Sequence, residues 1–327
     1  MKISRSSIFI GVILSLAVAV VIIVVLYNAM TQDKETSLGD VFTYDLDELR
    51  KTDPALVKYA ETGSIETGFQ RVFAIAMDRS DRAYVAGDRA VRIFGDKGDI
   101  LQEIELSDSA GCLAVDDDGT LYVGLKDHIE VFDSSGVRRA KWESPGRRTT
   151  LTSIAISGDD IFAADAGGRA VLRYDKSGKL VSRIGERDKD RNISGFVIPS
   201  PYFDLAVAPD GLLRVVNPGL HRIEAYTFDG DLEFWWGKAS TAIEGFSGCC
   251  NPVNFALMPD GGFVTCEKGL PRVKIYDIEG AFQSVVVGAD VLNTYGRGII
   301  FDVAADSQGR ILLLDPIKRV LRIFTLT

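Results

Sequence analysis

The residue types best suited to chemistry gather in one stretch, 243–276, which reads IEGFSGCCNPVNFALMPDGGFVTCEKGLPRVKIY. It brings together adjacent thiols, side-chain amides, a carboxylate and an ammonium group within a short length of chain. Groups of this kind can orient a polar ligand, form a disulfide or bind a soft metal ion. The candidates are Cys249, Cys250, Asn251, Asn254, Cys266, Glu267 and Lys268.

The cysteines of this stretch allow three interpretations. A disulfide could join Cys266 to Cys249 or Cys250, or could join the adjacent pair in a strained ring, and either would suit a domain outside the cytoplasm. Metal binding by the soft thiolates is the second interpretation, and buried inert thiols are the third. Adjacent cysteines without a C-x-x-C spacing are weak evidence for zinc, so we favour a disulfide or inert thiols. The sequence leaves the presence of a metal open.

A second set of polar residues stands nine positions before an aromatic residue that recurs along the chain. Such carboxylates and amides commonly accept hydrogen bonds from the backbone of the next turn, and this scaffold role is favoured over a polar binding rim. As a rim, they would distribute ligand-binding groups around one face of the molecule. They are Asp165, Asn217, Glu267 and Asp315.

The recurring aromatic belongs to a six-fold internal repeat. Each copy has an apolar-Ala-apolar run, a turn rich in Asp and Gly, a second apolar strand and a third strand that ends at the aromatic. Short strands repeated every 40 to 50 residues or so are typical of a β-propeller, and four antiparallel strands would make one blade. The aromatics are Phe94, Phe132, Tyr174, Tyr226, Tyr276 and Phe324. The pattern predicts an all-β, six-bladed propeller.

The last copy lacks its outer strand, because only three residues follow Phe324. An unpaired edge would result unless another segment covered it. The segment 56–67, LVKYAETGSIET, precedes the first repeat and has β character at Val57, Tyr59 and Ile65. We therefore expect this segment to supply the missing strand and close the ring.

The repeats resemble the NHL family of propellers. The similarity covers 69–324 and is strongest in the fourth copy, where NPGLHRIEAY contains Asn217 and His221. Proteins with related propellers include interaction domains, extracytoplasmic sensors, an amidating lyase and lactone hydrolases, so the resemblance implies a fold rather than one activity. With only two histidines in the chain, the three-histidine metal centre of the amidating lyase cannot be assembled. A lactonase-like metal site would instead use Glu267, Asn217, Asn254 and Asp315.

The N-terminal part predicts a membrane anchor. Residues 8–27 are apolar, with no charge between Arg5 and Asp33, and this length can cross a bilayer as a helix. A cleaved signal peptide usually has a shorter apolar region, so an uncleaved anchor is favoured. Lys2 and Arg5 precede the span, and segment 31–54 contains seven acids and three bases, so the N-terminus is expected in the cytoplasm and the propeller outside it. The expected organisation is an anchor at 1–30, an acidic linker at 31–55 and a propeller at 56–327.

The net charge and the motifs of the chain limit the classes of partner and activity that it can have. A net charge of −9 argues against a nucleic-acid partner, and the basic patch around Arg138 fits a protected edge strand. No motif for a catalytic nucleophile or phosphate loop is found, so no catalytic residue is assigned and no cofactor is indicated. We expect a membrane-tethered binding module for a protein or small molecule at the channel mouth. A metal-dependent hydrolase and a redox protein using Cys249 and Cys250 are the alternatives.

Overall fold

The computed structural model describes residues 16, 18–27, 46–292 and 299–327. The chain divides into two units, Met1–Glu48 and Leu49–Thr327. In the first, residues 18–27 are helical. Among the described residues, no helix combines the length and the apolar character needed to cross a membrane. Much of the predicted anchor, including residues 8–15, lies outside the described part of the chain.

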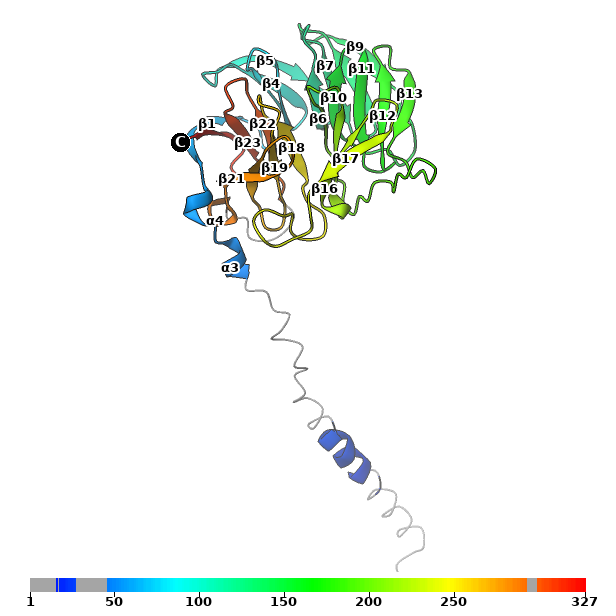
Figure 1. Ribbon diagram of the computed structural model, residues 1–327, viewed down its shortest axis with the longest axis vertical. Helices are drawn as coiled ribbons and strands as arrows, with labels where there is room; N and C mark the ends of the chain where they lie inside the picture. Colours follow the sequence, from blue (N-terminus) through cyan, green and yellow to red (C-terminus); the bar gives the residue numbers. More distant parts are fainter. Residues whose placement is uncertain (1–15, 17, 28–45, 293–298) are drawn as a thin grey trace, which may run out of the picture. The chain divides into compact units, whose positions relative to one another are not determined.

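The second unit is an all-β propeller of six four-stranded antiparallel sheets (Figure 1). Blade one contains β2 (Val72–Met77), β3 (Ala83–Gly87), β4 (Ala90–Phe94) and β5 (Ile100–Glu105). Blade two contains β6 (Ala110–Val115), β7 (Leu121–Leu125), β8 (His128–Phe132) and β9 (Arg138–Trp142). Blade three contains β10 (Leu151–Ser157), β11 (Asp160–Asp165), β12 (Ala170–Asp175) and β13 (Leu180–Ile184). Blade four contains β14 (Leu205–Val207), β15 (Leu213–Asn217), β16 (Arg222–Tyr226) and β17 (Leu232–Trp236). Blade five contains β18 (Asn254–Leu257), β19 (Phe263–Cys266), β20 (Val273–Tyr276) and β21 (Phe282–Val287). The short helices are α3 (Leu46–Arg50), η1 (Pro54–Leu56), η2 (Pro218–Leu220) and α4 (Ala289–Leu292).

Blade six is assembled from two distant parts of the chain. Its strands β22 (Asp302–Ala305), β23 (Ile311–Asp315) and β24 (Val320–Leu326) are followed in the sheet by β1 (Tyr59–Glu66). β1 runs antiparallel to β24, from the pair Tyr59 and Leu326 to the pair Glu66 and Val320, with one bulge. β1 thus occupies the position expected for segment 56–67.

The turns between the third and fourth strands show why the repeat has its sequence. In blade two, Asp133 Oδ1 accepts hydrogen bonds from the backbone N–H groups of Ser135 and Val137, both at 3.0 Å. Gly136 follows with a φ of 81°, a conformation that costs glycine little. The repeated Asp-x-x-Gly sequence therefore closes a hairpin by local chemistry.

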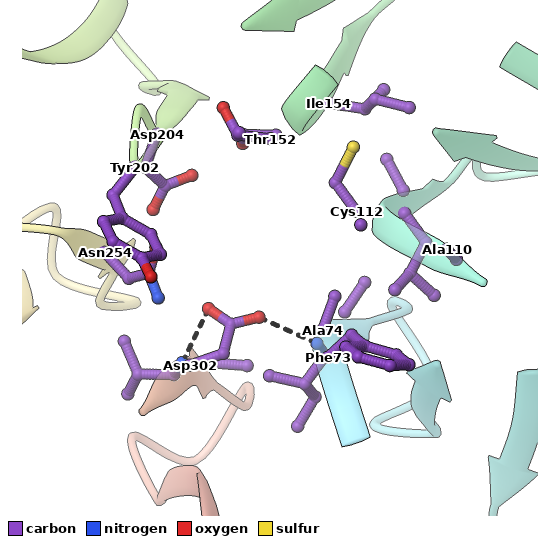
Figure 2. A pocket seen from close by; sticks show the side chains of 18 of the residues that line it. Phe73, Ala74, Ala110, Cys112, Thr152, Ile154, Tyr202, Asp204, Asn254 and Asp302 are labelled. Carbon is purple, nitrogen blue, oxygen red and sulfur yellow. Dashed lines mark hydrogen bonds between the residues drawn. The ribbon is translucent and has the colours of Figure 1, made fainter. Parts of the chain in front are cut away.

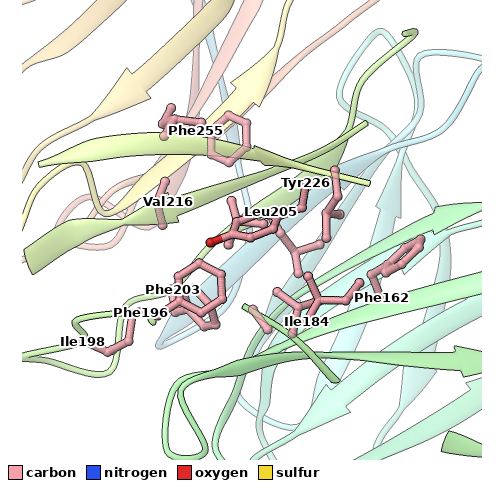
Figure 3. Close-up of a cluster of buried hydrophobic side chains, with 14 of the residues drawn as sticks. Phe162, Ile184, Phe196, Ile198, Phe203, Leu205, Val216, Tyr226 and Phe255 are labelled. Carbon is pink, nitrogen blue, oxygen red and sulfur yellow. The ribbon is translucent and has the colours of Figure 1, made fainter. Parts of the chain in front are cut away.

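Large apolar side chains fill the spaces between blades. One cluster joins blades three, four and five and includes Phe162, Phe203 and Tyr226 (Figure 3). The Trp236 ring of blade four lies 4.9 Å from the rings of both Phe263 and Tyr276 of blade five, measured between ring centroids. Burial of each such side chain contributes about 1.5–3 kcal/mol, so the recurring aromatics stabilise the contacts between neighbouring sheets.

Candidate functional site: the central channel

The innermost strands of the six blades surround a central cavity of about 860 Å³. Each of these strands contacts the next around the ring, and β22 contacts β2, which completes it. Consecutive residues of each innermost strand line the cavity, for example all of β2 and residues 109–115 around β6. A cavity of this size lies within the range of small-molecule sites.

One position of each innermost strand forms what we call the channel ring. The six positions are equivalent, because in every blade the residue at this position pairs with the same position of the neighbouring second strand. The ring consists of Ala74, Cys112, Ser153, Asp204, Asn254 and Asp302. Its composition is uneven, because blades one and two contribute an alanine and a thiol whereas blades four to six contribute two carboxyl groups and an amide.

The polar members of the channel ring connect neighbouring blades. Asp204 of blade four accepts a hydrogen bond from the Phe255 N–H of blade five at 2.8 Å. Asn254 of blade five donates to the Phe301 carbonyl at 2.9 Å. Asp302 of blade six accepts from the Ile75 N–H of blade one at 2.8 Å. These side chains therefore stabilise the closed ring as well as face the cavity.

The two carboxyl groups also have capacity for a ligand. Each oxygen of Asp204 and Asp302 accepts one backbone N–H, from the following residue or from the next blade, and a carboxylate offers about four acceptor positions. Figure 2 shows the Asp204 and Asp302 side chains turned toward the open centre of the channel, with Asn254 between them. Both aspartates are partly accessible from the cavity. A donor in the channel can reach these oxygens.

Burial changes the protonation of both groups. Desolvation raises the pKa of Asp204 to about 6, against the opposing effect of hydrogen bonds from Ser153, Phe255 and Leu205. Desolvation and the neighbouring Asp204 charge raise the pKa of Asp302 to about 7, and two backbone N–H groups oppose this. Both pKa values lie well above the usual value near 3.9, so the pair changes charge close to neutral pH.

The opposite side of the channel is apolar. Ala74, Ala110 and Ile154 line it together with Cys112. Burial, reinforced by the charges of Asp204 and Asp302, raises the pKa of the Cys112 thiol, so this thiol is neutral. Phe73 stands at the same side with 37% of its surface exposed (Figure 2). The cavity therefore has an acidic half and an apolar half.

Three of the residues predicted from the repeat have contacts typical of a scaffold. Asp165 accepts the Thr150 and Gly168 N–H groups, both at 2.9 Å, and Asp315 accepts those of Ile317 and Lys318. Asn217 accepts the Val197 N–H at 2.9 Å and donates to Glu224. The bonds from Thr150 to Asp165 and from Val197 to Asn217 tie the loop before the innermost strand to the end of the second strand, so in blades three and four these places share one face. None of the three residues lines the cavity.

Glu267 is fully buried in an ion network. Its carboxylate accepts hydrogen bonds from Arg272 Nε at 2.9 Å and from the Ser247 N–H at 2.9 Å, and it lies 2.7 Å from Lys274 Nζ. Lys274 is also buried, and desolvation lowers its pKa to about 8 even though Glu267 opposes the shift. The Lys274 ammonium donates to the Gly245 carbonyl at 2.6 Å. Glu267 thus holds the loop that leads into blade five, and it is not placed to meet a ligand in the channel.

The remaining predicted residues lie in that same loop or beside it. Asn251 is buried and joins two segments, since its Oδ1 accepts the Lys268 N–H at 2.9 Å and its Nδ2 donates to the Ser247 carbonyl at 2.6 Å. Lys268 Nζ donates to Ser200 Oγ at 2.6 Å and stands 4.8 Å from the centre of the Tyr202 ring, which lines the cavity. Asn254 is the one predicted binding residue that lines the cavity itself.

All four cysteines are free thiols. Cys249 and Cys250 have their sulfur atoms 3.1 Å apart, whereas Cys266 lies buried at the end of β19. Burial and the charges of Asp302 and Asp204 raise the pKa of Cys266 well above its usual range. Cys112 and Cys266 therefore have the properties of unreactive core thiols.

The residues proposed for a metal-dependent hydrolase do not converge. Asn217, Glu267 and Asp315 are each held within their own blade by the contacts described above. Within residues 46–292 and 299–327, no group of three or more His, Cys, Asp or Glu side chains is arranged to hold a metal ion.

Asp204, Asp302 and Ser153 are channel residues that our sequence reasoning did not identify. Their signal is present in the repeat, because each stands directly before the apolar-Ala-apolar run, in SIAI, DLAV and DVAA. Aligning the six copies on that run and comparing the preceding residue places all six members of the channel ring in one column. In that column the first copy has alanine where the fourth and sixth copies have aspartate, so the alignment also shows which blades make the ring acidic.

Comparison with solved structures supports the fold. The virginiamycin B lyase of Staphylococcus aureus is 14% identical, with a TM-score of 0.56 over 83% of this chain and 99% of that one. A streptogramin B lyase is 12% identical, with a TM-score of 0.57 over 84% of this chain and 100% of that one. The WD40 propeller domain of Doa1 is 15% identical, with a TM-score of 0.54 over 82% of this chain and 97% of that one. These likenesses support the β-propeller fold, and the six sheets of the structure give the number of blades.

No family profile matches the chain, and no curated protein does either. The NHL resemblance therefore stays a prediction from the repeat sequence. At identities of 12 to 15%, the solved structures are informative about fold and not about activity.

Proposed function

We propose that this chain is a binding module whose central channel takes a small ligand with a cationic group and an apolar body. The observation that carries this proposal is the division of the cavity into an acidic half, with Asp204 and Asp302, and an apolar half around Ala74 and Phe73. A ligand of that chemistry would place its positive charge between the carboxyl groups and its apolar part against blades one and two.

The raised pKa values give this proposal a physical basis. Two carboxyl groups that resist ionisation are stabilised in their charged form by a nearby positive charge, because opposite charges lower a carboxyl pKa. The bound cation would therefore displace protons from the pair. Binding should strengthen as the pH rises from 5 to 7, by up to about tenfold per pH unit for each proton released.

Calorimetric titration of the full-length protein in detergent tests the proposal with two probes of matched shape. Benzylamine should bind, and benzyl alcohol, which lacks the charge, should bind at least about tenfold more weakly. Asp204→Asn and Asp302→Asn should each weaken amine binding, while the control Asp229→Asn changes a side chain that is 90% exposed and should have no effect. Equal binding of the amine and the alcohol, or no binding of the amine, would refute this ligand class.

The location outside the cytoplasm is part of the same proposal and rests on the sequence. The apolar segment 8–27, with Lys2 and Arg5 before it and the acidic segment 31–54 after it, supports a single-pass anchor with an extracytoplasmic NHL-like propeller. Protease added to intact cells or spheroplasts should then digest the propeller. Protection until the membrane is permeabilised would contradict this topology.

The geometry favours binding over lyase chemistry. One of the similar structures is a catalytically inactive histidine-to-alanine variant of virginiamycin B lyase. In this chain the His128 ring contacts the Asp127 carboxylate at 3.0 Å, and the His221 ring contacts the Gly248 carbonyl at 2.8 Å. Neither histidine lines the cavity, so a histidine acid or base is not placed beside the channel ring.

A further inference from the structure

The adjacent cysteines of the blade-five loop form a polarised pair. Cys249 is exposed, Cys250 is 1% exposed, and their sulfur atoms are 3.1 Å apart. A disulfide bond is about 2.05 Å long, so the two sulfur atoms need to approach by roughly 1 Å to become bonded. The Cys250 thiol is thus shielded by protein, whereas the Cys249 side chain is exposed to solvent.

Two polar side chains surround the buried thiol. Ser200 Oγ lies 3.3 Å from Cys250 Sγ, and Lys268 Nζ donates to Ser200 Oγ at 2.6 Å. An ammonium group linked to the sulfur through a hydroxyl stabilises a thiolate and can supply a proton to a leaving oxygen. The positive charge also disfavours a metal cation at this place, which distinguishes a nucleophilic thiol site from a metal site.

The surrounding loop fixes this arrangement. Asn251 joins the cysteine segment to Lys268 through the two backbone contacts described above, and Ser247 is held by buried Glu267. His221 Nε2 contacts the carbonyl of Gly248, the residue directly before the pair. Reactive groups that are held before reaction lose little entropy during it.

We propose that Cys249 and Cys250 form a redox dithiol that reduces small hydroperoxides. The Cys250 thiolate attacks one peroxide oxygen, the O–O bond breaks, and Cys250 becomes a sulfenic acid while the leaving oxygen takes a proton supplied through Lys268 and Ser200. The Cys249 thiol then attacks the Cys250 sulfur, the S–S bond forms, the S–O bond breaks, and water leaves. In sum, two thiols and one hydroperoxide give one disulfide, one alcohol and one water. For hydrogen peroxide, the alcohol is a second water.

The electrostatics of the pair support these roles. Burial alone would raise the pKa of Cys250, but hydrogen bonds from Lys268, Ser200 and Cys249 outweigh it and lower this pKa. The hydrogen bond to Cys250, followed by burial, raises the pKa of Cys249, so Cys249 keeps its proton until the second step. Cys249 and Lys268 are the titratable groups that face Cys250. The buried thiols Cys112 and Cys266 have raised pKa values, and they serve as internal controls.

The first test treats the reduced full-length protein with equimolar hydrogen peroxide and maps the products by mass spectrometry. We expect a loss of about two mass units confined to the peptide that contains Cys249 and Cys250, reversed by dithiothreitol. Cys249→Ser should stop at a sulfenic acid on Cys250 that dimedone traps, and Cys250→Ser should abolish the fast reaction. The variant Cys266→Ser should react like the wild type, because Cys266 is buried in blade five and does not line the cavity. Oxidation of all four cysteines at similar rates would overturn the proposal.

The second test separates the role of Lys268 from mere stability. The rate at which iodoacetamide alkylates Cys250 is measured against pH in the wild type, in Lys268→Met and in the control Lys179→Met, which changes an exposed turn residue. Lys268→Met should move the midpoint of the profile to higher pH and slow alkylation at pH 6 by about tenfold for each unit of pKa change. Matching near-ultraviolet circular dichroism spectra would show that the variant is folded. An unchanged midpoint in the folded variant would overturn the assigned role of Lys268.

Discussion

Replacement of Glu267 by Gln tests whether the blade-five loop depends on a buried ion network. The substitution keeps the size of the side chain but removes the negative charge that faces Arg272 and Lys274, which are 3% and 0% exposed. Removing one partner of a buried ion pair costs about 3–5 kcal/mol, because the remaining charge stays desolvated. For a domain of this size each kcal/mol lowers Tm by roughly 2–4 °C, so we expect a decrease of about 6–20 °C.

Thermal and urea unfolding followed by circular dichroism provide the measurement. The matched control is Glu103→Gln, which removes the same charge from a surface pair with Arg92, where the Glu103 side chain is 46% exposed. Exposed pairs contribute at most about 1 kcal/mol, so the control should unfold close to the wild type. The double variant Glu267→Gln with Lys274→Met should recover part of the loss, because it also removes one stranded charge. Equal Tm values for Glu267→Gln and the control would refute the reasoning.

Three further predictions concern ring closure, pH and packing. A truncated protein that begins at Phe69 lacks β1 and should unfold at a lower temperature than one that begins at Thr52; equal Tm values would contradict closure by β1. Asp302 ionises near pH 3.9 when unfolded and near 7 when folded, so its contribution to stability should fall by roughly 2–3 kcal/mol between pH 5 and 8, and Asp302→Asn should make the pH dependence of stability less steep in urea titrations. Gly178→Ala would place a Cβ 2.4 Å from the Trp142 ring at a φ of 85°, so we expect a loss of more than about 1 kcal/mol; an unchanged urea midpoint would argue against this packing.

The architecture could be predicted because its signals are local. An Asp-x-x-Gly turn closes its own hairpin, as Asp133 and Gly136 show, and the recurring aromatic follows at a fixed distance along each copy. The site could be predicted only in part. Asn254 was recognised, whereas Asp302 was not, because Asp302 stands out only when the residues before the six apolar-Ala-apolar runs are aligned. Its bond to Ile75, 227 residues away, has no local signal of its own.

Because Glu267 lies in the irregular stretch around the start of blade five, it was also predicted to bind a ligand. In the structure its carboxylate is buried. Sequence shows that a carboxylate, a guanidinium and an ammonium group occur near one another, but it does not show that Arg272 and Lys274 are folded onto the same side of blade five. The side-chain direction set by strand pairing decides which of these groups meets the channel and which is used to hold the loop.

The pairing of β1 with β24 also has a consequence for the order of folding. Glu61 and Arg322 form a salt bridge at 2.6 Å although 261 residues separate them in the chain. During translation, β1 emerges before all six inner strands and has to stay without its partner until β24 leaves the ribosome. Contacts of such long sequence separation slow folding, and an unpaired strand is prone to aggregate during the delay. The polar side chains along β1, including Glu61 and Ser64, should help to keep this unpaired strand soluble until β24 pairs with it.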